Sequence, residues 1–158
     1  PFCQELLVQL ARELPKLEAG NVQLRAIGIG TPAVARDVAA HVGFPEGLLY
    51  ADPDNALYDD LQLNAGVGRT FFNPATPLAI RDRLFKGGAA DLGNVLGKWL
   101  PSPGRKGALI IPPKQSQAFN QGGMFVFDNK KTLLAHYDVS TGAHANLADV
   151  VQLALSRR

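Results

Sequence analysis

The chain has 158 residues, of which 46% are hydrophobic and 19% charged, and this balance is typical of one folded domain with a core of its own. Its 16 basic and 14 acidic residues leave a net charge of +2, which argues against a nucleic-acid partner held by phosphate contacts. Its one cysteine cannot form an internal disulfide, and no run of about 18 apolar residues is present to span a membrane.

The N-terminal residues have the features of a helix's first turn. Pro1 suits the first helical position, and Glu5 suits the positive end of the helix dipole. Apolar residues recur every fourth position over 2–14 and predict one buried face, which Pro15 should kink and Gly20 should end. Because natural domains rarely begin inside a helix's first turn, we expect the chain to be N-terminally truncated.

Strand and helix signals then alternate. They predict a buried strand at 22–29, a helix at 32–42, a short strand at 48–51 and a short helix that begins at Asp52-Pro53. Thr31 caps the longer helix, Pro32 occupies its first position and Gly43 ends it. This order predicts an α/β fold with parallel strands joined by right-handed crossovers.

Residues 64–121 form a long Pro/Gly-rich insertion. Helices are expected at about 76–85 and 91–99, whereas the prolines beyond Leu100 oppose regular structure as far as Gly122. Long insertions in compact domains are usually functional. We therefore expect this insertion to become ordered by packing on its own domain or on a partner protein.

The last elements predict a known topology. An antiparallel hairpin is expected at 124–127 and 132–137 around the turn Asp128-Asn129, followed by a helix at 144–155. With one further strand before Pro1, the order becomes a βαβ half followed by a ββα half, which is thioredoxin-like. We expect one thioredoxin-like domain over 1–158, with the strand at 22–29 in a central position and its first strand missing upstream.

Cys3 is the residue that suggests chemistry. The thiolate is the reactive form of cysteine, and a helix N-terminus lowers a thiol pKa because it favours negative charge. A cysteine directly before Pro1 would complete a C-x-x-C motif, Cys-Pro-Phe-Cys, at the start of a helix. The alternative is that Cys3 is a small hydrophobic residue on the apolar face.

Several segments together resemble the peroxiredoxin-like 2 group of the AhpC/TSA (alkyl hydroperoxide reductase/thiol-specific antioxidant) family, within the thioredoxin-like superfamily. The matching segments are Pro1-Phe2-Cys3-Gln4-Glu5-Leu6, Ile27-Gly28-Ile29-Gly30, Leu49-Tyr50-Ala51-Asp52-Pro53 with Leu57-Tyr58, Asn120-Gln121-Gly122-Gly123-Met124-Phe125-Val126, His136-Tyr137-Asp138 and Gly142-Ala143-His144-Ala145. They span almost the whole chain in order, and the insertion is the least specific part.

The resemblance implies a thioredoxin fold and an antioxidant thiol–disulfide oxidoreductase. Cys3 matches the second cysteine of the family's C-x-x-C and would be the resolving thiol, with the nucleophilic cysteine expected just before Pro1. The implied substrates are peroxides or protein disulfides, with a thioredoxin- or glutathione-type reductant and no bound cofactor. Relatives occur in plastids and in cytosol, so chloroplast and cytoplasm both stay open as locations.

Two alternatives remain open. In the first, the chain is a redox-silent thioredoxin-fold subunit that docks into a larger, for example chloroplast, complex through residues 64–121. In the second, it binds a dinucleotide, because Gly28-Ile29-Gly30-Thr31-Pro32-Ala33 fits G-x-G-x-x-A after a strand and Asp52 follows about 20 residues later.

The remaining polar candidates give weaker signals. His41, His136 and His144 lack the spacing of metal ligands, so no metal site is expected, and His144 is interpreted as the start of the last helix. Arg69 and Arg81 would suit a peroxide or anion site, but solvated surface charge is the simpler interpretation.

Overall fold

The computed structural model describes residues 2–63, 120–139 and 143–156, and for Phe2 the backbone only. The predicted insertion, with its two helices, therefore lies outside the described residues except for its last two positions. The elements are α1 (Phe2–Ala19), β1 (Ala26–Ile29), α2 (Pro32–Val42), a 3-10 turn η1 (Glu46–Leu48), β2 (Leu49–Asp52), α3 (Ala56–Asp60), β3 (Gly123–Asp128), β4 (Lys131–Tyr137) and α7 (Leu147–Leu155).

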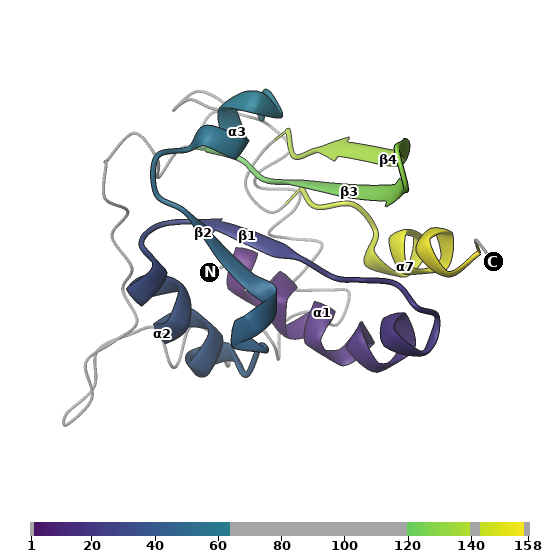
Figure 1. Ribbon diagram of the computed structural model, residues 1–158, viewed down its shortest axis with the longest axis horizontal. Helices are drawn as coiled ribbons and strands as arrows, with labels where there is room; N and C mark the ends of the chain where they lie inside the picture. The colour runs from purple at the N-terminus through teal and green to yellow at the C-terminus, as the bar shows by residue number, and fades with distance from the viewer. Residues whose placement is uncertain (1, 64–119, 140–142, 157–158) are drawn as a thin grey trace.

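The strands form two separate pairs (Figure 1). β1 and β2 are parallel, with Ala26 opposite Leu49 and Ile29 opposite Asp52, as the crossover through α2 requires. β3 and β4 form an antiparallel hairpin. The predicted mixture of helices with parallel and antiparallel strands is therefore present, but in the described residues β1 is paired with β2 alone, so its predicted central position is not shown.

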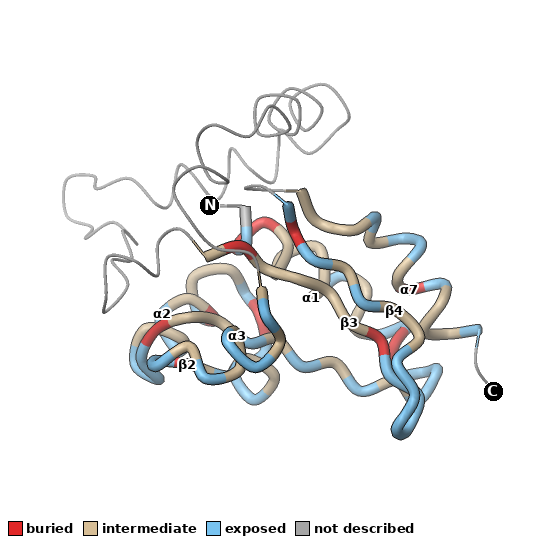
Figure 2. Tube along the Cα trace, turned by 90° about the horizontal axis from the view of Figure 1, so that it is seen from above, coloured by how far each residue is buried: buried red, intermediate tan, exposed pale blue. Residues whose placement is uncertain are grey.

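Three helices and the strands enclose the core. α1 contacts both α2 and α7, α2 packs on β2, and α7 packs on β3. The buried apolar residues come from these same elements and from the segment after α2: Leu17, Ala39, Phe44, Val126 and Val151. Figure 2 marks the buried positions in red along the chain. No helix among the described residues is long and apolar enough to cross a membrane.

The first helix ends as predicted, but the first strand begins later than predicted. α1 continues through Pro15 to Ala19, and the amide of Gly20 donates to Lys16 O. Asn21 then adopts a left-handed conformation (φ 55°), and the Val22 amide donates back to Leu17 O. Because Val22 is still bonded to the helix end, the predicted strand at 22–29 is shortened to Ala26–Ile29.

The local signals around α2 are confirmed. Thr31 Oγ1 accepts a hydrogen bond from the Val34 amide at 3.4 Å, and Pro32 is the first helical residue. Gly43 ends the helix with φ 70°, a left-handed conformation that glycine adopts without a steric penalty.

The hairpin turn is one residue later than predicted. β3 continues through Asp128, and the turn residues are Asn129 and Lys130, with Asn129 at φ 53°. A register irregularity lies between Val126 and Phe127. On one face of the hairpin, Phe125 stacks on Phe127 (6.2 Å between ring centroids) and meets Tyr137 edge-on.

The last helix begins three residues later than predicted. Its cap is Asn146, whose Oδ1 accepts hydrogen bonds from the amides of Ala148 and Asp149. An asparagine cap competes well for a helix start because its side chain satisfies amides that the helix leaves open. The interpretation of His144 as the start of this helix is therefore wrong.

A side chain at Gly123 would not fit where β3 begins. A Cβ atom built there lies 2.7 Å from the His136 carbonyl oxygen and 3.0 Å from both Leu63 Cδ2 and Phe125 Cε2. We expect Gly123→Ala to lower the free energy of unfolding by about 1–3 kcal/mol, because the backbone of β4 must shift. Urea unfolding measures this loss, and Gly47→Ala is the control, since its Cβ meets nothing within 4 Å. Equal effects of the two substitutions would contradict this account of Gly123.

Candidate functional site

The buried polar residues lie at the ends of elements. Gln4 and Glu5 are in the first turn of α1, Asp52 ends β2, Gln121 precedes β3 and Asp138 follows β4. In Figures 1 and 2, the start of α1, the helix α3 and the open end of the hairpin lie away from the hairpin turn and the C-terminus. Burial of a polar group is costly unless it is hydrogen-bonded, so this end of the molecule is the first place to seek a site.

Cys3 lies in the first turn of α1, where the sequence placed it, and its side chain is exposed. Two residues further on, the Glu5 side chain is fully buried and accepts a hydrogen bond from Gln9 Nε2 at 3.3 Å. Gln4 is 8% exposed, and its Oε1 has no hydrogen-bond partner among the described residues. The thiol therefore stands at the border between solvent and a buried polar layer.

Asp52 organises the segment that follows β2. Its Oδ1 accepts from the Ala56 amide at 3.0 Å, and its Oδ2 accepts from the amides of Leu57 at 3.0 Å and Tyr58 at 3.3 Å. The prediction that Asp52-Pro53 begins a helix is wrong in position, since α3 begins at Ala56. The carboxylate nevertheless caps that helix from a distance, because the first amides of a helix lack partners within it.

The pKa of the Tyr58 phenol depends on groups from both strand pairs. Burial raises the pKa of its phenol well above the ordinary value of 10.0, and negative charge at Cys3, Asp52 and Asp138 raises the pKa further. The phenol oxygen also lies 3.5 Å from the Ile27 carbonyl oxygen of β1. Residues from α1, β2 and the end of β4 therefore act on one side chain of α3, and Tyr58 stays neutral at physiological pH.

A buried carboxylate and two histidines form the second part of the site. Asp138 is 1% exposed, and its Oδ2 lies 2.6 Å from His144 Nδ1. His136 Nε2 lies 2.9 Å from the Ala143 carbonyl oxygen and 3.3 Å from Asp138 Oδ1. Since carbonyl and carboxylate oxygens only accept, His136 carries a proton on Nε2 and His144 carries one on Nδ1.

The sequence candidates thus have mixed outcomes. Cys3 and Asp52 both lie within electrostatic reach of Tyr58, while His41 lies in the last turn of α2. The pairing of Asp138 with His144 and the role of Tyr58 were missed, although all three residues fall in segments that carry the family resemblance.

Arg69 and Arg81 lie outside the described residues. Within the described ranges, no group of three His, Cys, Asp or Glu residues is arranged to hold a metal ion.

The contacts of Asp52, the acidic residue of the predicted dinucleotide motif, give little support to the dinucleotide interpretation. A dinucleotide-binding fold uses the carboxylate at the end of its second strand for a ribose hydroxyl. Both carboxylate oxygens of Asp52 instead accept backbone amides of α3. Thr31 likewise uses its hydroxyl to cap α2.

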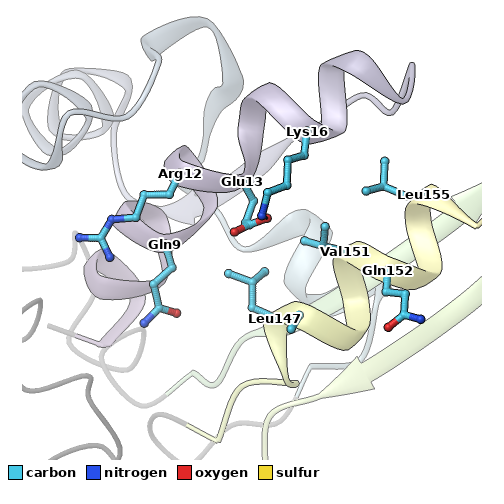
Figure 3. A pocket seen from close by; sticks show the side chains of 9 residues that line it. Gln9, Arg12, Glu13, Lys16, Leu147, Val151, Gln152 and Leu155 are labelled. Atoms are coloured by element: carbon cyan, nitrogen blue, oxygen red, sulfur yellow. The ribbon is translucent and has the colours of Figure 1, made fainter.

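A groove of about 570 Å³ lies between α1 and α7 (Figure 3). One wall is polar and comes from Arg12, Glu13 and Lys16, and the other is apolar and comes from Leu147, Val151 and Leu155. Lys16 Nζ is 2.7 Å from Glu13 Oε2. None of the candidate residues described above lines this groove.

Comparison with known families identifies the chain. The model of the family described as AhpC/TSA antioxidant enzyme matches residues 9–140, which is most of the sequence. The chain therefore belongs to the AhpC/TSA antioxidant family, within the thioredoxin-like superfamily, whose members are in general peroxiredoxin-like thiol oxidoreductases. No curated protein and no solved structure matches the chain. The matched range includes Asp52, Tyr58 and Asp138, whereas Cys3 and His144 lie just outside it.

Removal of the Asp52 carboxylate should destabilise α3. We expect Asp52→Ala to lower the free energy of unfolding by about 1–2 kcal/mol, because three backbone amides lose their acceptor. Thermal or urea unfolding measures the loss. Asp60→Ala is the matched control, since Asp60 is exposed at the end of the same helix. A loss no larger than that of the control would show that these amides are satisfied without Asp52.

Tyr58 should make the protein less stable in alkali. Its folded pKa is raised, so above the ordinary value the unfolded chain releases the phenol proton first and the free energy of unfolding falls as pH rises. Below that value the contribution is fully present. We expect Tyr58→Phe to flatten this decline and to remove the highest-pH component of the phenolate absorbance change. An unaltered alkaline titration in the variant would contradict the assignment.

Proposed function

We propose that the protein is a peroxiredoxin-like thiol–disulfide oxidoreductase that reduces peroxides or protein disulfides through a C-x-x-C motif. Cys3 would be the second cysteine of that motif and the resolving thiol, and the nucleophilic cysteine would directly precede Pro1. The observation that carries the proposal is the exposed thiol of Cys3 in the first turn of an 18-residue helix, in a chain of the AhpC/TSA family.

The helix position supports thiol chemistry for an electrostatic reason. The first N–H groups of a helix have no partner within it and give its N-terminal end a partial positive charge. At the start of α1 this charge stabilises a thiolate relative to a thiol. The nucleophilic thiolate would attack one oxygen of the peroxide, so that an S–O bond forms, the O–O bond breaks and the leaving oxygen takes a proton. Cys3 would then displace water from the sulfenic acid and form the disulfide, which a thioredoxin- or glutathione-type reductant would reopen.

The arrangement of the strands supports a single thioredoxin-like domain over residues 1–158. In the described residues, β1 is bonded to β2 and β3 to β4, with no strand joining the pairs. A strand before Pro1, placed between β1 and β3, would unite them in one mixed sheet and lead directly into α1. Its carboxyl end would hold the nucleophilic cysteine beside Cys3, and residues 64–121 would form the insertion.

A second function is favoured by one observation. The family match begins at Gln9, beyond the thiol, so the resemblance would also hold for a redox-silent subunit that docks into a larger complex through its insertion. The identity of the residue before Pro1 separates the two functions. Cysteine there favours catalysis, and any other residue favours docking.

Thiol trapping on the natural full-length protein tests the enzymatic proposal. Under a limiting dose of peroxide, the wild type should form an internal disulfide. Cys3→Ser should instead accumulate a sulfenic acid or a mixed disulfide with the reductant, because the attacking thiol remains but cannot be released internally. Mass spectrometry of alkylated peptides distinguishes these species.

The control for this experiment is an ordinary exposed thiol, for example glutathione at the same pH. If neither the wild type nor Cys3→Ser reacts with peroxide faster than that thiol, the enzymatic proposal is wrong and the docking function replaces it.

A further inference from the structure

The groove between α1 and α7 has two walls of opposite character (Figure 3). Its α1 wall is polar and consists of Gln9, Arg12, Glu13 and Lys16. Its α7 wall is mainly apolar and consists of Leu147, Ala148, Val151, Gln152 and Leu155. Both sets follow the spacing of three or four residues at which side chains share one face of a helix. An apolar row of α7 therefore stands opposite a polar row of α1.

This pairing leaves apolar surface in contact with water. Packed helices normally bring their apolar faces together, but Leu10, Leu14 and Leu17 of α1 are not among the described residues that line the groove. Of those described lining residues, only Val151 is buried, and the others are half-buried or exposed. An occupant that covers the apolar wall would be stabilised because it removes this surface from water.

The dimensions of the groove fit a helix. The lining residues cover two turns of each helix, about 10–12 Å at 1.5 Å per residue, around a volume of about 570 Å³. Apolar anchors at positions i, i+4 and i+7 of a bound helix cover the same length. A small ligand is usually enclosed over most of its surface, whereas most residues that line this groove are half-buried or exposed. The open shape therefore favours a helix of another protein over a small ligand.

The charge of the polar wall selects the kind of helix. Arg12 and Lys16 are cationic, Glu13 is anionic, and the α7 wall adds no charged residue. Lys16 Nζ lies 2.7 Å from Glu13 Oε2, but the Lys16 side chain is 64% exposed, and an exposed ion pair contributes little to stability. The ammonium can therefore exchange Glu13 for an incoming carboxylate at low cost. The net positive wall is complementary to acidic side chains and would repel basic ones.

We propose that the groove binds an amphipathic helix of a partner protein. Apolar anchors of this helix would lie on Leu147, Val151 and Leu155, and acidic residues along its flank would lie beside Arg12 and Lys16. The inference goes beyond the proposed function and does not depend on it, because Cys3 does not belong to the groove.

Synthetic helical peptides test this proposal on the natural full-length protein. The probe is a fluorescein-labelled peptide of leucine, alanine and glutamate, with the leucines on one face and the glutamates along its flank. One control peptide has the same composition with the leucines spread around the helix, and a second has lysine in place of glutamate. Fluorescence anisotropy should show saturable binding of the probe, and both controls should bind at least about 10-fold more weakly.

Charge reversal on the protein provides a matched pair of variants. Lys16→Glu should weaken binding of the glutamate peptide by about 10-fold and strengthen binding of the lysine peptide, because attraction and repulsion exchange places. A misfolded variant would not gain affinity for the lysine peptide. Lys130→Glu is the control, since it makes the same change at an exposed position in the hairpin turn, and it should match the wild type with both peptides.

The binding site is located by the amide chemical shifts of the ¹⁵N-labelled protein. Addition of the glutamate peptide should shift the amides of residues 9–16 and 147–155. Shifts confined to other segments, equal binding of the three peptides, or equal effects of Lys16→Glu and Lys130→Glu would each overturn the proposal. Sedimentation that shows a dimer of the protein, dissociated by Lys16→Glu, would also overturn it, because a second copy of the chain would then occupy the groove.

Discussion

The structure around the candidate site depends on the hydrogen-bond donors of two buried carboxylates, Asp52 and Asp138. A carboxylate removed from water loses its hydration, and it stays ionised only where other donors replace the water. Asp52 obtains three backbone amides of α3, and Asp138 obtains the imidazole of His144. Each match ties the end of a strand to the next segment of the chain. The position of α3 beside the end of β2 follows from the first of these matches.

The elements that local chemistry determines could be predicted from the sequence. Thr31 and Gly43 bound α2 through contacts within four or five residues, so the pattern of residues was sufficient. The strand that was predicted at 22–29 begins late because Val22 bonds to Leu17 at the end of α1. The start of α7 was missed because Asn146 provides a cap that competes with the earlier residues. A neighbouring element decided the first boundary, and a local cap decided the second.

The site could be predicted only in part. Cys3 could be predicted as a candidate because it lies in the first turn of a helix, and the local sequence is enough to predict that turn. Asp138 and His144 are six residues apart in the sequence, and no periodicity marks such a pair. Tyr58 gains its environment from α1, β2 and the end of β4, which only the folded chain brings together. The family resemblance contained all three segments but assigned none of these residues a role.

Two glycines at the start of β3, Gly122 and Gly123, link the hairpin to the candidate site. A Cβ atom at Gly122 would lie 3.2 Å from Asp138 Oδ2, the oxygen that holds His144. The next residue, Gly123, sits opposite Tyr137 and lets β3 lie close to the His136 carbonyl. The backbone approach that the hairpin needs is therefore also the approach that brings Gly122 against the carboxylate. Because a side chain at Gly122 would meet Asp138 Oδ2, this glycine lets the backbone lie against the buried carboxylate, whose hydrogen bond to Nδ1 fixes the tautomer of His144.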